Sequence, residues 1–450
     1  MATDISNFEF IKTTNQPPLD YKTLSERVDS EVTIEGTVHR LRVLPQVTFL
    51  IIRGPRFCVQ TVVEPPVDAS TLKEGDFIRI QGRVLAANLS DKTIFPRNIE
   101  IKVSEIKTIH APATIMPFDI SKKVLNVGGE TLFDMRPISL RHPKVRAVFK
   151  ISESIVNAFH SFLSDNGFTR IFSPKIVFAG AEGGANIFQI QYFDRVAYLA
   201  QSPQFYKQFG IGVFGRVYDV GTVFRAEKHN TNRHLNEYVS LDLEMGFIES
   251  HLDVMNMEAA LLRYMMDYLR DNNQFELDLL EVTLPIIGEQ IPIITLDQAH
   301  EIYYKKKKID MRAEPDLAAE EEKYLTEWSL KEFASEFLFV THYPTMKRPF
   351  YTKDDPAVPD KTRSFDLLFR GIEITTGGQR INDYDEQVAK FKRFGLNPDD
   401  FASFLQMHKY GAPPHGGLAI GLERLTARLC NITNIKEATF FPRDIHRITP

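Results

Sequence analysis

Five short apolar runs between residues 31 and 109 constrain the fold more than any other feature of the sequence. They are rich in β-branched residues, alternate apolar with polar positions and are separated by turn residues: EVTIEGTVHRL, VTFLIIRG, FCVQTVV, DFIRIQGRVL and NIEIKVSEI. Alternation with a period of two is typical of strands that bury one face. Five such strands in so short a segment predict a small closed β-barrel.

The pattern changes beyond this segment. Residues 110–120 (HAPATIMPFDI) form a connector punctuated by prolines, and apolar residues then recur with helical spacing from about His142 to Asn166. Strand-like and helix-like segments follow to the C-terminus, which indicates a larger mixed domain. The expected organisation is a polar N-terminal tail (1–25), a barrel domain (26–109), a connector (110–135) and a large domain (136–450).

Composition excludes several classes of protein. The chain has 450 residues, of which 43% are hydrophobic and 25% charged, an ordinary globular balance. No run approaches about 20 apolar residues, so we expect no membrane span. A net charge of -5 excludes a wholly basic nucleic-acid-binding protein, although it allows a local binding face. The N-terminus lacks the pattern of a signal or transit peptide, so the cytosol is the expected location.

Two further features have simple interpretations. Cys58 and Cys430 are too few for a disulfide framework or a four-cysteine zinc site, and we interpret both as small core residues. The run from Lys305 to Lys308 could contact nucleic acid. A solvated helix end is favoured, because blocks of like charge usually face water.

The run GTVFRAEKHNTNRHLNEYVSLDLEMGF (221–247) predicts two strands joined by a long polar loop. Arg225 and Glu227 are two residues apart, so on a strand they would share one face. Arg233 and His234 lie in the loop. Arginines on such a hairpin suit phosphate oxygens, because the guanidinium group forms paired, charge-assisted contacts. For the Arg-x-Glu pair alone, an ion-paired hairpin surface is the simpler interpretation.

The run PPHGGLAIGLERLTARLC (413–430) predicts a glycine-rich strand that leads into an amphipathic helix beginning near Leu422. Arg424 falls in the first turn of this helix, where a cation opposes the helix dipole. A polyphosphate bound at the helix N-terminus would explain a cation at that position.

The run SFDLLFRGIEITTGGQRI (364–381) predicts a strand on which Asp366, Leu368 and Arg370 alternate. Asp366 and Glu373 could share a hard cation, because carboxylate oxygens completed by phosphates are the usual magnesium shell. Two glycines that follow Thr376 would allow close approach of the backbone.

Together these runs resemble the signature motifs of class II aminoacyl-tRNA synthetases. NGFTRIFSPKI (166–176) is similar to motif 1, FRAE…RHLNEY to motif 2 and GLERL (421–425) to motif 3. The segments SPKIVFAGAEGGANIF, AYLAQSPQFYKQ, GIEITTGGQR and FFPRDIHRITP further resemble the aspartyl-tRNA synthetase family. The resemblance extends from about residue 30 to the C-terminus.

The resemblance is to the archaeal and eukaryotic type, because only about 120 residues separate Phe247 from Asp366 and leave no room for the bacterial insertion domain. Asparaginyl-tRNA synthetase is the close relative to exclude. Lys207, in the segment QFYK, would suit an aspartate side chain, whereas the asparaginyl family typically has an acid at that position.

The resemblance implies an α+β fold, with an N-terminal OB-fold barrel and a catalytic domain built on an antiparallel sheet flanked by helices. It implies ATP and L-aspartate as substrates and Mg²⁺ as the metal. The implied catalytic residues are Arg225, Glu227 and Arg424. The implied ATP-binding residues are Arg225, Glu227, Arg233, His234, Leu235, Tyr238, Glu373, Gly421, Leu422, Glu423 and Arg424. The implied aspartate-binding residues are Glu182, Gln204, Lys207, Arg225, Thr376, Arg380 and His415, and the implied metal ligands are Asp366, Glu373 and Thr376.

Simpler roles stay open for three of these residues: Glu182 as a turn acid, Tyr238 as a core residue and His415 as a hydrogen-bonded loop histidine. No covalent nucleophile is needed, because a substrate carboxylate attacks the α-phosphate in line. The terminal ribose hydroxyl of the tRNA then attacks the resulting anhydride. The family resemblance also implies a homodimer.

The barrel fits the oligonucleotide-binding fold, which reads single-stranded bases by stacking and edge contacts. In the family it binds the anticodon loop, and Phe49 and Gln60 match the aromatic and the amide that meet the central base. Arg53 and Arg56 could contact phosphates, and Phe49 could instead be barrel core. The expected tRNA partner is tRNA(Asp). Whether tRNA(Asn) is also charged stays open, because His39 occurs in both kinds of relative.

Two other functions are compatible with a synthetase-like chain. One is a paralogue that forms aspartyl-adenylate for an acceptor other than tRNA, but such paralogues tend to lack the barrel. The other is a non-catalytic RNA-binding protein on the same frame, but that interpretation predicts loss of residues such as Arg225, Lys207 or Glu373, which are all present.

Overall fold

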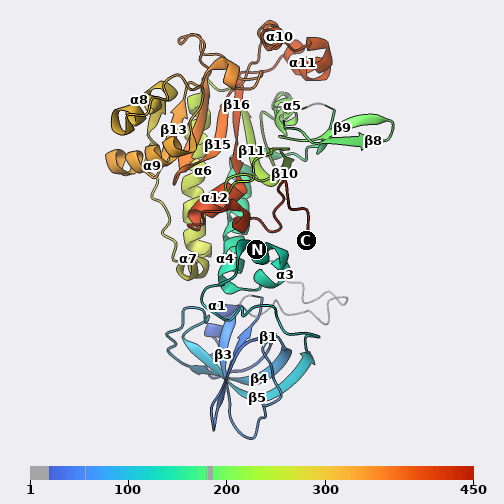
Figure 1. Ribbon diagram of the computed structural model, residues 1–450, viewed down its shortest axis with the longest axis vertical. Coiled ribbons are helices and arrows are strands. Elements are labelled where there is room, and N and C mark those ends of the chain that lie inside the picture. The colour runs from blue at the N-terminus through green and yellow to red at the C-terminus, as the bar shows by residue number, and fades with distance from the viewer. Residues whose placement is uncertain (1–19, 56, 179, 181–185) are drawn as a thin grey trace. The chain divides into compact units, whose positions relative to one another are not determined.

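The computed structural model describes residues 20–55, 57–178, 180 and 186–450. The chain divides into two compact units, Met1–Val145 and Arg146–Pro450, and the boundary falls just inside the long helix α4 (Pro143–Asp165) (Figure 1). Among the described residues, no helix is long and apolar enough to cross a membrane.

The first unit contains the five-stranded closed barrel that the sequence predicts. Its strands pair in the order β1 (Glu31–Val43), β2 (Thr48–Arg53), β3 (Cys58–Val63), β5 (Ile99–His110) and β4 (Phe77–Ala86). Alternate residues of β4 are buried, as the period-two pattern requires. Helix α1 (Tyr21–Ser25) precedes the barrel, and helices α2 (Gly129–Asp134) and α3 (Arg136–Ser139) follow it in the same unit.

The second unit is built on an eight-stranded sheet. The strand order is β12 (Ile293–Thr295), β13 (Phe337–Thr341), β14 (Ser364–Phe369), β15 (Ile372–Gln379), β16 (His415–Gly421), β11 (Glu237–Gly246), β10 (Arg216–Phe224) and β6 (Thr169–Arg170). All neighbouring pairs are antiparallel except the two at the edges, β12 with β13 and β10 with β6. This arrangement confirms the antiparallel α+β fold expected from the sequence.

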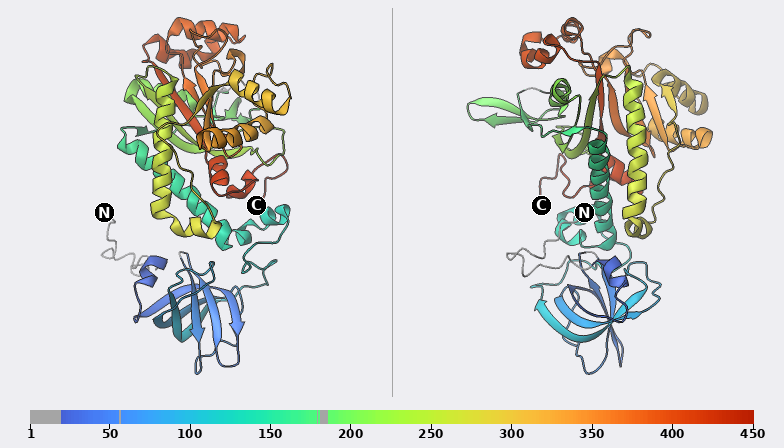
Figure 2. Two further views of the ribbon diagram at one scale, coloured as in Figure 1. Left: turned by 90° about the vertical axis from the view of Figure 1, so that its left-hand side faces the viewer. Right: turned by 180° about the vertical axis from the view of Figure 1, so that it is seen from behind.

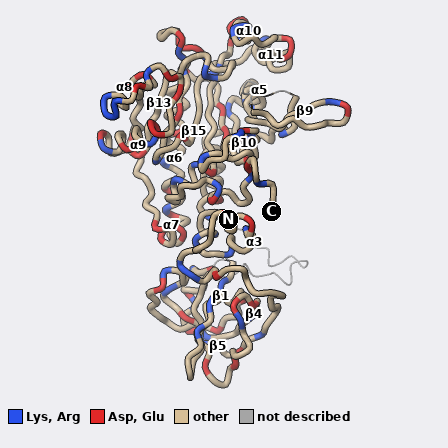
Figure 3. Tube along the Cα trace, viewed as in Figure 1, with Lys and Arg blue, Asp and Glu red and all other residues tan. Residues whose placement is uncertain are grey.

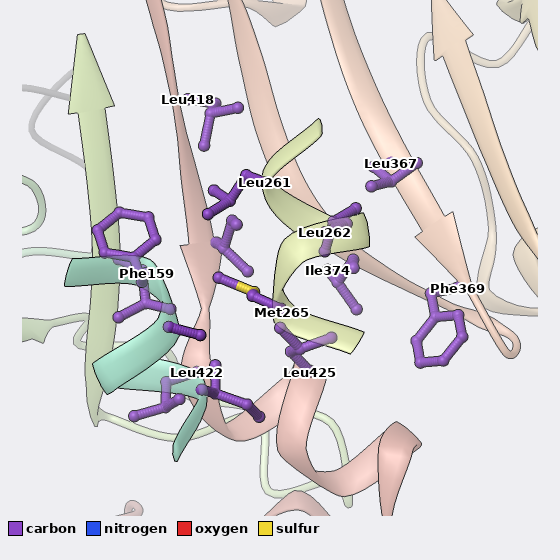
Figure 4. Close-up of a cluster of buried hydrophobic side chains, with 14 of the residues drawn as sticks. Phe159, Leu261, Leu262, Met265, Leu367, Phe369, Ile374, Leu418, Leu422 and Leu425 are labelled. Carbon is purple, nitrogen blue, oxygen red and sulfur yellow. The ribbon is translucent and has the colours of Figure 1, made fainter. Parts of the chain in front are cut away.

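One face of this sheet carries the main apolar core. Helices α4, α6 (His251–Asn272) and α12 (Leu422–Leu429) supply side chains to it, including Phe159, Leu262, Met265 and Leu425 (Figure 4). Helix α6 lies along the sheet (Figure 2) and contacts β15 and β16. The remaining helices of this unit are α5 (Gln204–Phe214), α7 (Gln274–Leu280), α8 (Leu296–Lys307), α9 (Ala319–Phe333), α10 (Tyr384–Arg393) and α11 (Ala402–Lys409).

The central strand β11 shows how the sequence separates the core from the opposite face. Leu241 and Leu243 point into the core, whereas Ser240, Asp242 and Glu244 occupy the alternate positions. The partners of these three residues on β16 are Gly421, Ala419 and Gly417, all of them small. The second face of the sheet is therefore polar and has room for a ligand. A smaller sheet formed by β7 (Ile176–Val177), β9 (Arg195–Leu199) and β8 (Gln189–Tyr192) lies beside α5 in Figure 1.

Three local predictions have clear outcomes. The lysine run forms the exposed last turn of α8 and its cap, which agrees with a solvated helix end (Figure 3). Both cysteines are buried and free, as expected of core residues. The predicted alternation through Arg370 is wrong, because β14 ends at Phe369 and Arg370 turns with a φ of 44°. Its guanidinium instead forms an ion pair with Glu336 at 2.5 Å.

The buried carboxyl of Glu258 makes the free energy of unfolding depend on pH. Glu258 lies on α6 and is fully buried, and this burial raises the pKa of its carboxyl from 4.5 to about 8. The folded protein therefore keeps a proton that the unfolded chain releases. The free energy of unfolding should fall as pH rises from about 4.5 to about 8.

Glu258→Gln should remove this dependence, because an amide does not titrate. Relative to the wild type, the variant should gain stability with rising pH by at most ~1.4 kcal/mol per unit across that window. Urea unfolding at pH 5, 6.5 and 8 measures the difference, with the exposed Glu327→Gln on α9 as control. A difference between variant and wild type that stays constant with pH would contradict the prediction.

Candidate active site

A cavity of about 540 Å³ lies on the polar face of the eight-stranded sheet. Its described lining includes seven Lys or Arg side chains and three carboxylates: Lys207, Arg225, Arg233, Lys347, Arg348, Arg380 and Arg424, with Glu227, Glu373 and Glu423. An excess of cations in a concave, partly enclosed site favours anionic ligands. The walls come from α5, α12, the β10–β11 loop, strands β11, β15 and β16, and the segment 346–352.

One part of the cavity wall is a buried network of opposite charges. Lys207, only 1% exposed, places its Nζ 2.8 Å from Asp242 and 3.5 Å from Glu244. Arg380 reaches the same Glu244 at 2.9 Å. Burial alone would raise the pKa of Glu244, but the charges of Arg380 and Lys207 hold it below its usual value. Lys207 and Arg380, the two cations that the family resemblance assigns to the substrate carboxylate, therefore lie together and are held by ion pairs.

Local structure explains how these groups meet. Gln204 and Lys207 are three residues apart on α5, so they share the buried face of that helix. The Gln204 side chain accepts a hydrogen bond from Arg380 at 3.3 Å. Gly417 is required opposite Glu244, because a Cβ at that position would lie 2.1 Å from the Glu244 Oε2 atom.

The structure places His415, another expected aspartate-binding residue, outside the cavity lining. His415 is fully buried at the start of β16. Burial lowers its pKa to about 4, so the ring is neutral; its Nε2 accepts from Gln208 and its Nδ1 donates to the Pro413 carbonyl, at 2.9 Å each. This geometry fits the simpler interpretation of a hydrogen-bonded histidine. Glu182 lies outside the described residues.

The β10–β11 loop brings five expected nucleotide-binding residues to the cavity: Arg225, Glu227, Arg233, His234 and Leu235. Strand β10 ends at Phe224, so Arg225 and Glu227 lie in the loop and not on one strand face as predicted, although their side chains come within 3.9 Å. The Arg225 guanidinium lies 5.7 Å from the ring centroid of Tyr238 on β11. His234 lies 3.7 Å from Glu227, and burial lowers the pKa of His234 despite that charge.

Helix α12 supplies a further cation, Arg424, to the cavity. Arg424 lies in the first turn of this helix and donates to the Glu373 carbonyl at 3.0 Å, with the Glu373 side chain at 3.5 Å. Glu423 accepts from the Val239 backbone through both oxygens at 3.1 Å, and burial raises its pKa to about 7. Leu235 and Gly421 line the cavity, whereas Leu422 belongs to the apolar core and is not among the lining residues.

A β-bulge brings the three expected metal ligands to one face. The register of β14 with β15 shifts between Leu367 and Leu368, so Glu373 and Thr376 point to the same side although they are three residues apart. The Thr376 hydroxyl donates to Glu373 at 2.9 Å, and Asp366 lies directly opposite Thr376.

This oxygen set fits a magnesium ion. Asp366 Oδ2 accepts from Arg348 at 2.6 Å, while its buried Oδ1 has no hydrogen-bond partner. Two carboxylates and a hydroxyl are the hard oxygen ligands that Mg²⁺ prefers, with phosphates filling the shell. Among the described residues, no group of three or more His, Cys, Asp or Glu forms an alternative metal site.

Comparison with known proteins identifies the family. The family model for class II tRNA synthetases (D, K and N) matches residues 128–445. The chain belongs to this family. Aspartate--tRNA(Asp/Asn) ligase of Deinococcus radiodurans is 43% identical to it over 95% of this chain and 97% of that one. The ligase of the same name from Thermus thermophilus is 42% identical over 95% and 98%.

A solved structure supports the same assignment. The asparaginyl-tRNA synthetase of Pyrococcus horikoshii, complexed with asparaginyl-adenylate, superimposes with a TM-score of 0.87 at 31% identity. The match covers 96% of this chain and all of that chain. The class II synthetase architecture is therefore shared across both the barrel and the catalytic unit.

Sequence reasoning missed four residues of this synthetase site: Asp242, Glu244, Arg348 and Glu322. The first two had a detectable signal, because acids alternate with leucines in SLDLEMG, which is unusual for a buried strand. Arg348 is 11% exposed at its side chain, and its guanidinium lies 3.7 Å from the Tyr343 ring centroid; no local pattern marks it. Glu322 forms an ion pair with Arg233 across 89 residues of sequence.

The barrel of this synthetase presents two of the three expected anticodon-binding residues, Phe49 and Gln60, on its outer face. Phe49 pairs with Val62 and Gln60 with Ile51 on β2 and β3, so Phe49 and Gln60 point to the same side. Both are partly exposed, and Phe49 is absent from the described barrel core. Arg53 donates to the Arg141 carbonyl at 2.9 Å, and Arg56 lies outside the described residues.

Proposed function

We propose that this chain is an aspartate–tRNA ligase that activates L-aspartate with ATP and transfers it to the 3′ end of tRNA(Asp). The carrying observation is the buried pair Lys207 and Arg380 in a cavity that also contains Arg225, Arg233 and Arg424. The first pair suits a side-chain carboxylate, and the other three suit a triphosphate. Curated relatives with 43% and 42% identity carry this activity in their names.

The activation step depends on positioning of aspartate and ATP and on neutralisation of their negative charges. Arg225 would hold the α-phosphate and the reacting carboxylate, while Tyr238 supplies an aromatic face for the adenine. Arg233 and Arg424 would bind the outer phosphates. Asp366, Glu373 and Thr376 would hold Mg²⁺, which supplies charge neutralisation between the phosphates when bound.

Charge selects aspartate over asparagine. An amide in place of the substrate carboxylate carries no charge, so it would forgo the charge-assisted contacts that an aspartate side chain would make with the buried Lys207 and Arg380. ATP–pyrophosphate exchange with each amino acid tests the proposal directly. We expect exchange with aspartate and little with asparagine. Exchange that is faster with asparagine, or absent with both, would refute it.

We include tRNA(Asn) among the proposed acceptors, because both ligases at 43% and 42% identity are named for tRNA(Asp/Asn). Charging of purified tRNA(Asp) and tRNA(Asn) transcripts with labelled aspartate tests this extension. Charging of tRNA(Asp) alone would restrict the acceptor to that tRNA. Formation of aspartyl-adenylate with neither transcript charged would favour a non-tRNA acceptor.

We also propose that the catalytic unit forms a homodimer through its β6 edge. This edge strand has only two residues, and exposed aromatic side chains flank it. Phe172 lies two residues after the end of β6 and Phe214 two residues before the start of β10, with exposures of 82% and 52%. Burial of this edge in a two-fold interface would cover both rings. A monomeric mass in solution at micromolar concentration would contradict the dimer.

Phe49→Ala should weaken tRNA charging without affecting adenylate formation. Loss of one stacked base removes about 1–3 kcal/mol, so kcat/KM for tRNA should fall by ~10- to 100-fold. ATP–pyrophosphate exchange should be unchanged, because the cavity lies entirely in the second unit. Phe77→Ala is the matched control, since Phe77 is a 42% exposed phenylalanine on another barrel strand. An equal fall in both assays would indicate that Phe49 only supports the fold.

A further inference from the structure

Glu322 joins two parts of the nucleotide site from outside the three sequence motifs. It lies in the first turn of α9 and is 8% exposed. Its Oε2 atom accepts a hydrogen bond from the Arg233 guanidinium and a second one, at 3.0 Å, from the Glu373 backbone N–H. A single carboxylate oxygen therefore links the β10–β11 loop to strand β15.

The neighbouring glutamates of α9 have different environments. Glu321 accepts from the ring of His300 and from the Ala318 backbone, at 2.8 and 2.9 Å, and serves the start of the helix. Glu320 and Glu327 are exposed. Glu322 alone among these acids contacts residues of the cavity lining in the described structure. Its contacts therefore do not follow from the general acidity of the helix start.

The contact leaves Arg233 able to bind a ligand. A guanidinium has five N–H donors, and the bond to Glu322 uses the Nη2 nitrogen. Arg233 also lines the cavity and is 19% exposed at its side chain. A long loop arginine loses considerable rotamer entropy when it becomes ordered, so a partner that fixes it beforehand improves ligand affinity.

We propose that Glu322 is a positioning residue for the nucleotide, which holds Arg233 ready for the outer phosphates of ATP. The inference rests on the proposed function, in which Arg233 meets those phosphates. In the opposite arrangement, Glu322 would compete against phosphate for Arg233. The two arrangements predict opposite effects of removing the carboxylate, so binding measurements separate them.

The test compares the affinity of the full-length chain for ATP and AMP by calorimetry with Mg²⁺ and without aspartate. AMP lacks the outer phosphates. Glu322→Ala should weaken ATP binding by ~10- to 100-fold, the range of one charge-assisted contact, and leave AMP binding unchanged. Glu322→Gln, which keeps an acceptor oxygen without the charge, should show a smaller loss. Glu327→Ala, an exposed acid on the same helix, should change neither.

A double-mutant cycle makes the test specific to Arg233. If Glu322 acts through Arg233, the loss in ATP affinity of Glu322→Ala plus Arg233→Ala should hardly exceed that of Arg233→Ala alone. Tighter ATP binding by Glu322→Ala, equal weakening of ATP and AMP, or additive losses would each overturn the proposal. Nucleotide binding is measured without aspartate, so failure of aspartate-dependent exchange in the wild type would refute the proposed function separately.

Discussion

Replacing Lys207 by methionine should lower aspartate-dependent ATP–pyrophosphate exchange by ~10³-fold or more in kcat/KM. The substrate carboxylate would lose one of its two cations. The change also leaves Asp242, whose carboxylate lies 2.8 Å from the Lys207 Nζ atom and is almost fully buried, as an uncompensated anion next to the cavity lining. That anion would repel the aspartate side chain, so the loss should exceed that of a single hydrogen bond.

The same substitution should destabilise the catalytic unit by ~3–5 kcal/mol, because removal of one partner leaves the other charge buried and unpaired. Lys390→Met separates this effect from recognition. Lys390 is 3% exposed at its side chain and forms an ion pair with Asp354 at 2.5 Å, but it does not line the cavity. The Lys390→Met variant should be less stable than the wild type and should keep the wild-type KM for aspartate. Equal losses of activity in both variants, measured below their unfolding temperatures, would mean that Lys207 has only a structural role.

Arg225→Ala should reduce kcat for exchange by ~10²- to 10³-fold, the usual effect of losing one group that stabilises transition-state charge. Arg225 lines the cavity beside Glu227 and Tyr238. Arg225→Lys should recover little activity, because an ammonium group keeps the charge but lacks the planar fork.

Arg393→Ala is the control for Arg225. Arg393 is comparably exposed and forms ion pairs with Asp354 and Asp360, outside the cavity lining. The Arg393→Ala variant should retain normal ATP–pyrophosphate exchange. If Arg225→Ala raised the KM for ATP and left kcat unchanged, Arg225 would bind the ground state and the transition state equally, contrary to the proposed role.

The sequence predicts well those elements in which apolar residues recur with a regular period. The five barrel strands and helix α4 lie where apolar spacing places them, because burial of one face imposes that spacing. Strand ends are less predictable. Arg225 and Arg370 each fall one residue beyond a strand, so inferences from alternation failed at both.

The site depends on features with no local signature. The bulge that aligns Glu373 with Thr376 arises from pairing with β14, and the Lys207 network joins α5 to β11 across 35 residues. Arg348 reaches Asp366 from an irregular segment, and Glu322 reaches Arg233 from a helix that carries no motif. A family resemblance transfers residues in known motifs, but these supporting contacts appear only when the chain is folded.

The most direct test of the account is transfer of labelled aspartate to a tRNA(Asp) transcript by the purified wild-type chain with ATP and Mg²⁺. A second transcript with the central anticodon base replaced serves as control. We expect efficient charging of the first transcript and weak charging of the second. Aspartate-dependent ATP–pyrophosphate exchange, measured before tRNA is added, should be the same in both reactions. No charging of the first transcript by a chain that still forms aspartyl-adenylate would contradict the assignment as a tRNA ligase.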